Sequence, residues 1–388
     1  MADRNNETHF VAHALALARK GIALTSPNPC VGAVIVNSDE EIVGEGFHTY
    51  DGVHHAEVVA ITQAGEKSRG ASLYINLEPC SHRGRTGPCA EAIVAAGISR
   101  VVASMQDPNP LVSGKGFEFL RAAGVKVETG SLEAEARLLN ESFAKYTRHR
   151  IPLVTLKAAM TLDGKIAPPP RSPNKINTPA GAHTSRDWIT GDAARAHSQQ
   201  LRHQNDAILV GVGTILADDP LLTDRTGESR RRPLLRVILD SRLRLPLEAR
   251  VVQTARDHDV MVLCSLAEEK KKKKLQKLGV RVEQIAVGTT DGRPDMAGIV
   301  SALGELEVTS VLIEGGAHVN WAALASDIVD KVFLYYAPKI LAGEESIPFA
   351  YGSGFRSLRD APHVKALALH HFGEDFAVEG YLRDPYAD

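Results

Sequence analysis

Two runs of alternating strand-like and helix-like segments most strongly constrain how this chain can fold. In the first run, short apolar segments predict strands, and segments with apolar residues at helical spacing predict helices. The strands are expected at 31–36, 42–47, 72–77, 100–104 and 126–128. The helices are expected at 9–20, 55–65, 89–97 and 116–123. This alternation is typical of a sheet covered by helices.

A domain boundary is predicted near residue 150. A helix expected over 131–146 runs into Arg148-His149-Arg150, and Pro152 precedes a new strand at 153–159. Because 388 residues exceed one ordinary core, we predict domains at 1–149 and 150–388. Near the start of the second domain, residues 168–184 show neither helical nor strand periodicity, and we interpret this long segment as an insertion. Further strands are expected at 207–212, 235–239, 260–264, 280–285, 310–313 and 331–336, and helices at 192–203, 267–278 and 317–326.

Composition argues against nucleic-acid and membrane partners. The net charge is −2, aromatic residues make up 5%, and no stretch approaches the ~20 apolar residues of a membrane helix. The run Lys270 to Lys274 follows Glu268 and Glu269 and contains no aromatic residue, so we interpret it as a solvated helix face. The N-terminus lacks a secretory pattern, and four cysteines are too few for a disulfide scaffold. We therefore expect a cytoplasmic protein with small-molecule substrates.

A metal-binding pattern carries the strongest chemical signal in the chain. His55 is followed two residues later by Glu57, and Pro79-Cys80 is followed by Cys89. One histidine and two cysteines can hold one Zn²⁺ per chain and leave the fourth position open for water, as a catalytic site requires. Glu57 could then accept a proton from that water and pass it to a leaving amine, which is the arrangement of zinc deaminases.

Other interpretations of these residues are possible. Cys80 and Cys89 could be buried apolar thiols, or a closed structural zinc site could use His54 or His82 as fourth ligand. In a closed structural site, Glu57 would have no catalytic role. Cys30 and Cys264 lie in apolar strand contexts and are expected to be inert.

The loop between the two cysteines identifies a resemblance. Zinc deaminases usually have two residues between the cysteines, whereas here residues 81–88 separate them. The segment Pro79-Cys80-Ser81-His82-Arg83-Gly84-Arg85-Thr86-Gly87-Pro88-Cys89 resembles the deaminase half of the bifunctional riboflavin-biosynthesis deaminase/reductase family, which usually has proline at the position of Gly87. The resemblance includes Ser26-Pro27-Asn28-Pro29, Val31-Gly32-Ala33 and Gln106-Asp107-Pro108-Asn109-Pro110, and it covers essentially the whole chain.

This resemblance implies a diaminopyrimidinone substrate with a phosphoribosylamino group. It implies that Asn28, His48 and Asn109 face the substrate. Both asparagines precede prolines and could instead be turn residues. Cationic donors for the sugar phosphate are available in the cysteine loop at His82, Arg83 and Arg85.

The second half resembles the reductase half of the same family, which has a dihydrofolate-reductase-like fold. The matching segments are 157–165, 188–190, 213–223, 239–241 and 313–316. No G-x-G-x-x-G pattern is present, so a Rossmann domain is not predicted. Gly315-Gly316 after a strand would let the backbone approach a pyrophosphate at a helix N-terminus, although an ordinary tight turn is the alternative.

The resemblance also implies the residues of the reductase site. It places the cofactor at Met160, Trp188, Thr214, Asp218, Ser241 and Gly316. It places the substrate at Lys157, Arg202, Asp218, Leu222, Arg225 and Glu314, with Ser185 or Arg186 as a further contact. Ser241-Arg242 could hold a 2′-phosphate, which favours NADPH.

The sequence therefore predicts an α/β protein with an N-terminal cytidine-deaminase-like three-layer domain and a C-terminal dihydrofolate-reductase-like domain. The expected reactions are deamination of the pyrimidine and NADPH reduction of the ribosyl group to ribityl. One alternative is a nucleic-acid or nucleoside deaminase with a non-reductase C-terminal domain. A non-catalytic zinc-stabilised binding protein and activity of only one half are further alternatives, and homo-oligomer formation is left open.

Overall fold

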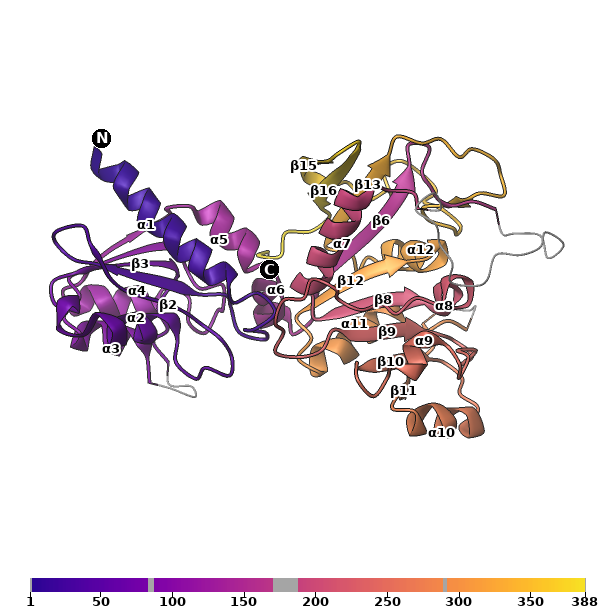
Figure 1. Ribbon diagram of the computed structural model, residues 1–388, viewed down its shortest axis with the longest axis horizontal. Coiled ribbons are helices and arrows are strands. Elements are labelled where there is room, and N and C mark those ends of the chain that lie inside the picture. Colours follow the sequence, from indigo (N-terminus) through magenta and orange to yellow (C-terminus); the bar gives the residue numbers. More distant parts are fainter. Residues whose placement is uncertain (1, 83–86, 170–187, 289–291, 388) are drawn as a thin grey trace. The chain divides into compact units, whose positions relative to one another are not determined.

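The chain forms two compact units. The computed structural model describes residues 2–82, 87–169, 188–288 and 292–387, with side chains from residue 7 onward. One unit comprises the residues up to Arg150 together with Ser229–Arg232, and the other comprises Ile151–Glu228 and Pro233–Ala387 (Figure 1). The small contribution of Ser229–Arg232 to the first unit has no counterpart in the sequence pattern.

A five-stranded mixed sheet forms the centre of the first unit. Its strands are β1 (Gly32–Val36), β2 (Ile42–Phe47), β3 (Ser72–Leu77), β4 (Arg100–Met105) and β5 (Lys126–Thr129), in the order β2-β1-β3-β4-β5. β1 is antiparallel to β2 and β3, whereas β3, β4 and β5 run parallel. β1 is buried along its whole length, which explains its continuous apolar sequence.

Helices cover both faces of this sheet, so the unit has three layers (Figure 1). α1 (Ala2–Arg19) and α5 (Glu133–Leu139) lie on one face, and α2 (Ala56–Ala64), α3 (Cys89–Ala95) and α4 (Lys115–Ala122) lie on the other. Two glycines permit close packing. A Cβ on Gly32 would lie 2.1 Å from the Ala14 carbonyl of α1, and one on Gly44 would lie 2.2 Å from the Ala60 carbonyl of α2.

The single helix predicted over 131–146 is wrong. The structure has α5 and a second helix, α6 (Glu141–His149), separated at Asn140. Asn140 adopts φ −113° and ψ 18° and is buried, with its side chain bonded to the backbone of Cys30. A tertiary contact therefore overrides the local helical pattern.

A nine-stranded sheet forms the centre of the second unit. In spatial order its strands are β11 (Arg281–Gln284), β10 (Val260–Cys264), β9 (Leu235–Leu239), β8 (Ala207–Gly211), β12 (Ser310–Gly315), β6 (Leu153–Thr161), β13 (Lys331–Ala337), β16 (Asp375–Tyr381) and β15 (Lys365–Phe372). The strands from β11 to β13 are parallel, and β16 and β15 are antiparallel. A two-stranded sheet pairs β7 (Lys165–Ala167) with β14 (Ile347–Pro348).

Both faces of the parallel part are buried. Ile208 and Val210 of β8 belong to one apolar cluster, and their neighbour Leu209 belongs to another. β10 alternates in the same way between Val262 and Leu263. Burial on both faces explains why these strands appear in the sequence as continuous apolar runs.

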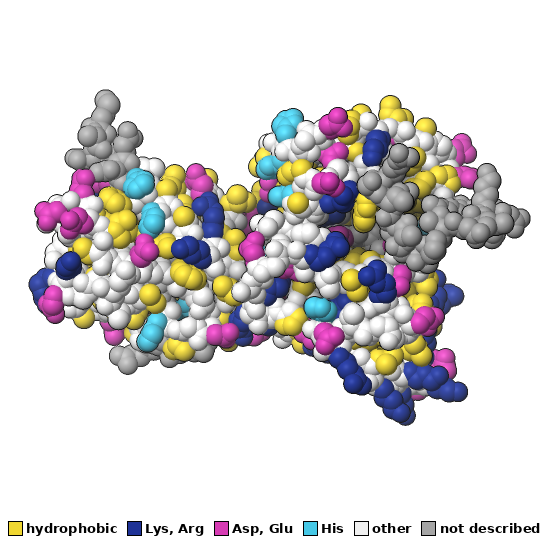
Figure 2. Space-filling view, in the orientation of Figure 1, with side chains coloured by type: hydrophobic (Ala, Val, Ile, Leu, Met, Phe, Trp, Pro, Cys, Tyr) yellow, Lys and Arg dark blue, Asp and Glu magenta, His cyan; other side chains and the backbone are white. Residues whose placement is uncertain are grey.

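Six helices are described in the second unit, and one of them carries the lysine run. They are α7 (Asp192–Gln204), α8 (Val212–Asp218), α9 (Arg250–Gln253), α10 (Glu269–Lys277), α11 (Met296–Glu305) and α12 (Ala317–Ala325). Leu275 anchors α10 in the core, while Lys273 and Lys274 are exposed. Figure 2 shows the basic side chains gathered over α10, which confirms the predicted surface helix. Most of the predicted insertion lies outside the described residues, and no described helix is long and apolar enough to cross a membrane.

Candidate active sites

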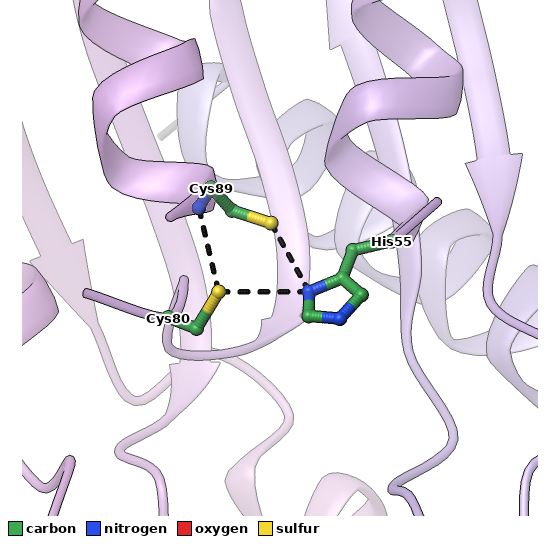
Figure 3. A group of neighbouring side chains, drawn as sticks. All are labelled: His55, Cys80 and Cys89. Atoms are coloured by element: carbon green, nitrogen blue, oxygen red, sulfur yellow. Dashed lines mark hydrogen bonds between the residues drawn. The ribbon is translucent and has the colours of Figure 1, made fainter. Parts of the chain in front are cut away.

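The first site joins His55, Cys80 and Cys89 at the ends of three elements. His55 precedes α2, Cys80 follows β3, and Cys89 is the first residue of α3 (Figure 3). Nδ1 of His55 lies 3.5 Å from Sγ of Cys80 and 3.2 Å from Sγ of Cys89, and all three donor atoms lie within 4.8 Å of one another. Ligand atoms of a tetrahedral zinc are separated by roughly 3.5–3.8 Å, as the Zn–N and Zn–S bond lengths require. The donor set and its spacing therefore fit zinc.

Glu57 lies in the first turn of α2, beside this group. Its side chain is buried, and among the described residues its Oε2 has no hydrogen-bond partner. Burial, together with the negative charge of Cys80, raises the pKa of the Glu57 carboxyl to about 7. A carboxyl group with such a pKa can both accept and release a proton near neutral pH.

The structure argues against a closed site with four protein ligands. Over the described parts of the chain, only His55, Cys80 and Cys89 gather as a candidate metal group. His54 and His82, the predicted alternatives for a fourth ligand, are both exposed and outside it. Cys264 is buried and is not part of this group.

Two of the three predicted substrate residues lie together near the metal ligands. Nδ2 of Asn28 is 3.0 Å from Nε2 of the buried His48, and the His48 ring centroid is 5.1 Å from that of His55. Asn109 is engaged in a turn, with its Oδ1 accepting the Leu111 N–H at 3.0 Å. The side-chain oxygen of Asn109 is therefore used in a turn, as the alternative interpretation of this residue predicted. Arg85 and Arg83 lie outside the described residues.

Glu78, which no sequence pattern indicated as a site residue, organises the loop that carries Asn109. The buried Glu78 carboxylate accepts the backbone N–H groups of four residues: Asp107, Gly114, Gly116 and Phe117. It thereby connects the segment before Cys80 to the 107–117 loop. Glu78 directly precedes Pro79-Cys80, which was the one signal available in the sequence. Its partners are distant in the sequence, and even the first of them, Asp107, lies 29 residues away.

The second site contains a buried charge cluster from three elements. Nε and Nη2 of Arg202, on α7, donate to both carboxylate oxygens of Glu314 on β12, at 2.7 and 2.9 Å. Nζ of Lys157, on β6, lies 3.6 Å from Oε2 of Glu314. Although burial alone would raise it, the charges of Arg202 and Lys157 lower the pKa of the Glu314 carboxyl to about 2. Three predicted substrate residues are thus brought together as an ionised group.

Arg202 also anchors the loop that carries two further predicted substrate residues. Its Nη1 donates to the Thr223 carbonyl at 3.0 Å. Leu222 is buried and Arg225 is exposed, while Asp218 is exposed at the end of α8. Because Glu314 already occupies two nitrogens of Arg202, the exposed Arg225 is the less engaged of the two arginines predicted to bind the substrate. Ser185 and Arg186 lie outside the described residues.

The predicted cofactor turn has room only for glycine. Gly315 and Gly316 have φ of 54° and 90° and directly precede α12. A Cβ on Gly315 would lie 2.3 Å from Oδ1 of Asn320, and one on Gly316 would lie 3.3 Å from Oγ1 of Thr214. Thr214 also donates from Oγ1 to the Gly315 carbonyl at 3.4 Å. Gly315 is buried and Gly316 is half-buried, and a glycine turn at the start of a helix is the kind of site that can receive a phosphate of a pyridine dinucleotide.

The other predicted cofactor residues have varied surroundings. Trp188 is 45% exposed and Arg195 stacks over its ring, whereas Met160 is buried on β6. Ser241 follows β9, and its carbonyl accepts the Leu266 N–H. Lys339 holds the backbone at Trp188, because its Nζ donates to the Trp188 and Ile189 carbonyls at 2.8 and 2.7 Å. No sequence pattern indicated that contact.

Two family models match most of the chain. Residues 4–105 match the cytidine and deoxycytidylate deaminase zinc-binding region, and residues 152–378 match the RibD C-terminal domain. The chain is 40% identical over 378 residues to the riboflavin biosynthesis protein RibD of Bacillus amyloliquefaciens, covering 97% of each chain. It is 39% identical over 376 residues to that of Actinobacillus pleuropneumoniae, covering 97% of this chain and 95% of the relative.

Solved structures show the same similarity over both units. The Acinetobacter baumannii RibD structure has a TM-score of 0.79 at 35% identity and covers 97% of this chain and 99% of its own. A Thermotoga maritima diaminohydroxyphosphoribosylaminopyrimidine deaminase/5-amino-6-(5-phosphoribosylamino)uracil reductase has a TM-score of 0.78 at 36% identity, with the same coverage.

The fold and the two sites define a bifunctional enzyme, in which a zinc-dependent, cytidine-deaminase-like hydrolase precedes a dihydrofolate-reductase-like oxidoreductase that uses NADPH. It acts on small-molecule pyrimidines. The chain belongs to the RibD family of riboflavin-biosynthesis deaminase/reductases.

Proposed function

We propose that the first unit deaminates 2,5-diamino-6-(5-phosphoribosylamino)pyrimidin-4-one and that the second reduces 5-amino-6-(5-phosphoribosylamino)uracil with NADPH. The similarity to the Thermotoga maritima enzyme, which is named for these two reactions, supports this pair of substrates. The observation that carries the deaminase assignment is the buried Glu57 carboxyl, which interacts with His55, Cys80 and Cys89 and has one oxygen without a hydrogen-bond partner among the described residues. The predicted cytoplasmic location belongs to the same proposal.

In the deaminase unit, His55, Cys80 and Cys89 would hold the zinc ion. When bound, zinc lowers the pKa of water toward neutrality. Glu57 accepts a proton from the attacking water and delivers it to the ring amine, which leaves as ammonia. Asn28 and His48, which are bonded to each other beside His55, orient the pyrimidine.

In the reductase unit, the chain contributes mainly position and charge. When bound, NADPH would supply the hydride for C1′ of the ribosyl group, and a proton delivered to the ring oxygen would complete the opening of the sugar to a ribityl chain. Glu314 holds Lys157 and Arg202 in one ionised group, which gives the substrate a fixed polar surface. The Gly315-Gly316 turn and Thr214 receive the cofactor phosphates.

A two-signal assay tests the proposal. The purified protein is given the diaminopyrimidinone substrate with and without NADPH, while ammonia and NADPH absorbance are followed. We expect ammonia release under both conditions and NADPH loss only when deaminated product has formed or has been supplied. NADPH oxidation without prior deamination, or no ammonia release from zinc-loaded protein, would contradict the proposed order of reactions.

A further inference from the structure

Two buried asparagines hold one short backbone segment beside the deaminase site. Oδ1 of Asn140 accepts the Cys30 N–H at 2.8 Å, and its Nδ2 donates to the Cys30 carbonyl at 3.1 Å. Nδ2 of Asn76, on β3, donates to the same carbonyl at 2.9 Å, and its Oδ1 accepts the Gly32 N–H at 2.9 Å. Four hydrogen bonds therefore fix residues 30–32, which we call the clamped segment.

The clamped segment is directly connected to both predicted base-reading residues. Asn28 precedes Cys30 by two residues, and His48 donates its backbone N–H to the Val31 carbonyl at 2.9 Å. The Asn28 and His48 side chains are then bonded to each other at 3.0 Å. His48 also contacts the His54 carbonyl through Nδ1 at 3.3 Å, next to the metal ligand His55. A shift of the clamped segment would move Asn28 and His48 relative to the metal ligands.

Asn140 makes these hydrogen bonds in a backbone conformation that interrupts the helix. The residues around it have helical spacing, yet the chain leaves helical geometry between α5 and α6 at this position. Asn140 is 1% exposed and Asn76 is 0% exposed. Buried carboxamides retain their place when their donors and acceptors are satisfied, and a fully bonded network specifies one arrangement of the chain.

We propose that Asn140 is a positioning residue of the deaminase site, which acts with Asn76 through the clamped segment to hold Asn28 and His48 at the pyrimidine. The inference rests on the proposed function, in which those two side chains bind the base. Asn140 touches neither the metal ligands nor Glu57 in any described contact, so its effect is on substrate binding.

Asn140→Asp tests the proposal with almost no change of volume. The carboxylate can still accept the Cys30 N–H but cannot donate to the Cys30 carbonyl, and it places charge against that oxygen. We expect the KM for deamination, measured on zinc-normalised protein, to rise by about tenfold or more, because misplaced binding groups are costly. The kcat should stay within about threefold, since general acid–base catalysis by Glu57 is unaffected. Zinc content and NADPH oxidation of supplied deaminated substrate should match the unmodified protein.

Asn37→Asp provides the matched control in the same unit. Oδ1 of Asn37 also accepts two backbone N–H groups, those of Asp39 and Glu41, but at the exposed turn between β1 and β2. This variant should keep the original KM. If Asn140→Asp folds poorly, Asn140→Ser removes the carboxamide without adding charge and leaves a hydroxyl that is too short to replace both bonds, and normalisation to bound zinc restricts the measurement to folded protein.

The outcomes separate this inference from the proposed function. An unchanged KM in zinc-loaded Asn140→Asp or Asn140→Ser, with only a lower unfolding temperature, would show a purely structural role and overturn the inference. Asn28→Ala serves as the reference variant. If Asn28→Ala raises KM but the Asn140 variants do not, only the clamp fails, whereas an unchanged KM in Asn28→Ala contradicts the proposed role of Asn28 itself.

Discussion

At the scale of single residues, the surroundings of a buried cysteine determine whether it belongs to the metal group. Cys89 is completely buried at the start of α3, and Cys264 is equally buried on β10 of the other unit. Only Cys89 lies with His55 and Cys80. The same residue type is thus a ligand at one position and a core side chain at the other, because three converging donors are needed to bind zinc.

Cys89→Ala should therefore abolish stoichiometric zinc binding. One of three ligands is lost, and no other described cysteine or histidine joins the metal group. Metal analysis of purified protein should give about one zinc per chain before the change and much less after it. Cys264→Ala is the matched control and should retain its zinc. Full zinc content in Cys89→Ala would disprove the ligand assignment.

Arg242→Ala should weaken the binding of NADPH and leave that of NADH nearly unchanged. Arg242 is exposed in the turn after β9, next to Ser241. A charge-assisted contact to a 2′-phosphate contributes ~1.5–3 kcal/mol, so the KM for NADPH should rise roughly tenfold or more. Arg244→Ala, which removes a second exposed arginine from the same turn, is the control. Equal effects of Arg242→Ala on the two cofactors would show that Arg242 does not contact the 2′-phosphate.

At the scale of secondary-structure elements, one carboxylate connects a helix and two strands of the reductase unit. Glu314 of β12 binds Arg202 of α7 and approaches Lys157 of β6. All three side chains are largely buried, with exposures of 9%, 13% and 12%. A buried ion pair is costly to break, because the remaining charges lose their partner while they stay away from water.

Glu314→Gln should destabilise the reductase unit, and the effect should depend on pH. The folded-state pKa of Glu314 is lowered from 4.5 to about 2, so its ionisation stabilises the folded state above pH 4.5 by roughly 3 kcal/mol. This contribution decreases as the pH falls from 4.5 toward 2. Urea unfolding at several pH values should show the largest difference from the original protein near neutral pH. Glu305→Gln, at an exposed position of α11, is the control.

At the scale of the whole molecule, the residues of the two chemistries belong to different compact units. His55, Glu57, Cys80 and Cys89 lie in the first unit, whereas the Glu314 cluster and the Gly315-Gly316 turn lie in the second. Each unit has its own sheet. A point change at one site is therefore expected to leave the residues of the other site in place.

Glu57→Gln and Asp218→Asn should separate the two reactions. Glu57→Gln cannot carry a proton, so deamination should fall by ~10²–10⁴-fold, while bound zinc and NADPH oxidation of supplied deaminated substrate persist. Asp218→Asn, at the exposed end of α8, should retain ammonia release and slow NADPH oxidation. Each variant is measured in both assays. Loss of both activities in Glu57→Gln would mean that the sites are coupled, and retained deamination would refute the proton-transfer role.

Local sequence predicted correctly those strands in which the pattern of apolar residues matches the pattern of burial in the structure. The predicted strands 42–47 and 72–77 coincide with β2 and β3, and the buried parallel strand β10 was predicted from its continuous apolar run. The metal ligands and Glu57 could also be predicted, because the requirement for particular donor atoms restricts the residue types and their order. These features by themselves determined the fold class and the chemistry of the first site.

Tertiary structure alone determined the hydrogen bonds and ion pairs between groups that are distant in the sequence. Asn140 interrupts a helical pattern because its carboxamide bonds Cys30, 110 residues away in the sequence. Lys339 reaches the Trp188 carbonyl across a separation of 151 residues, and Glu314 makes Arg202 part of an ion pair. Buried polar groups must find hydrogen-bond partners wherever the fold provides them, and local propensity contains no information about which distant group will be there.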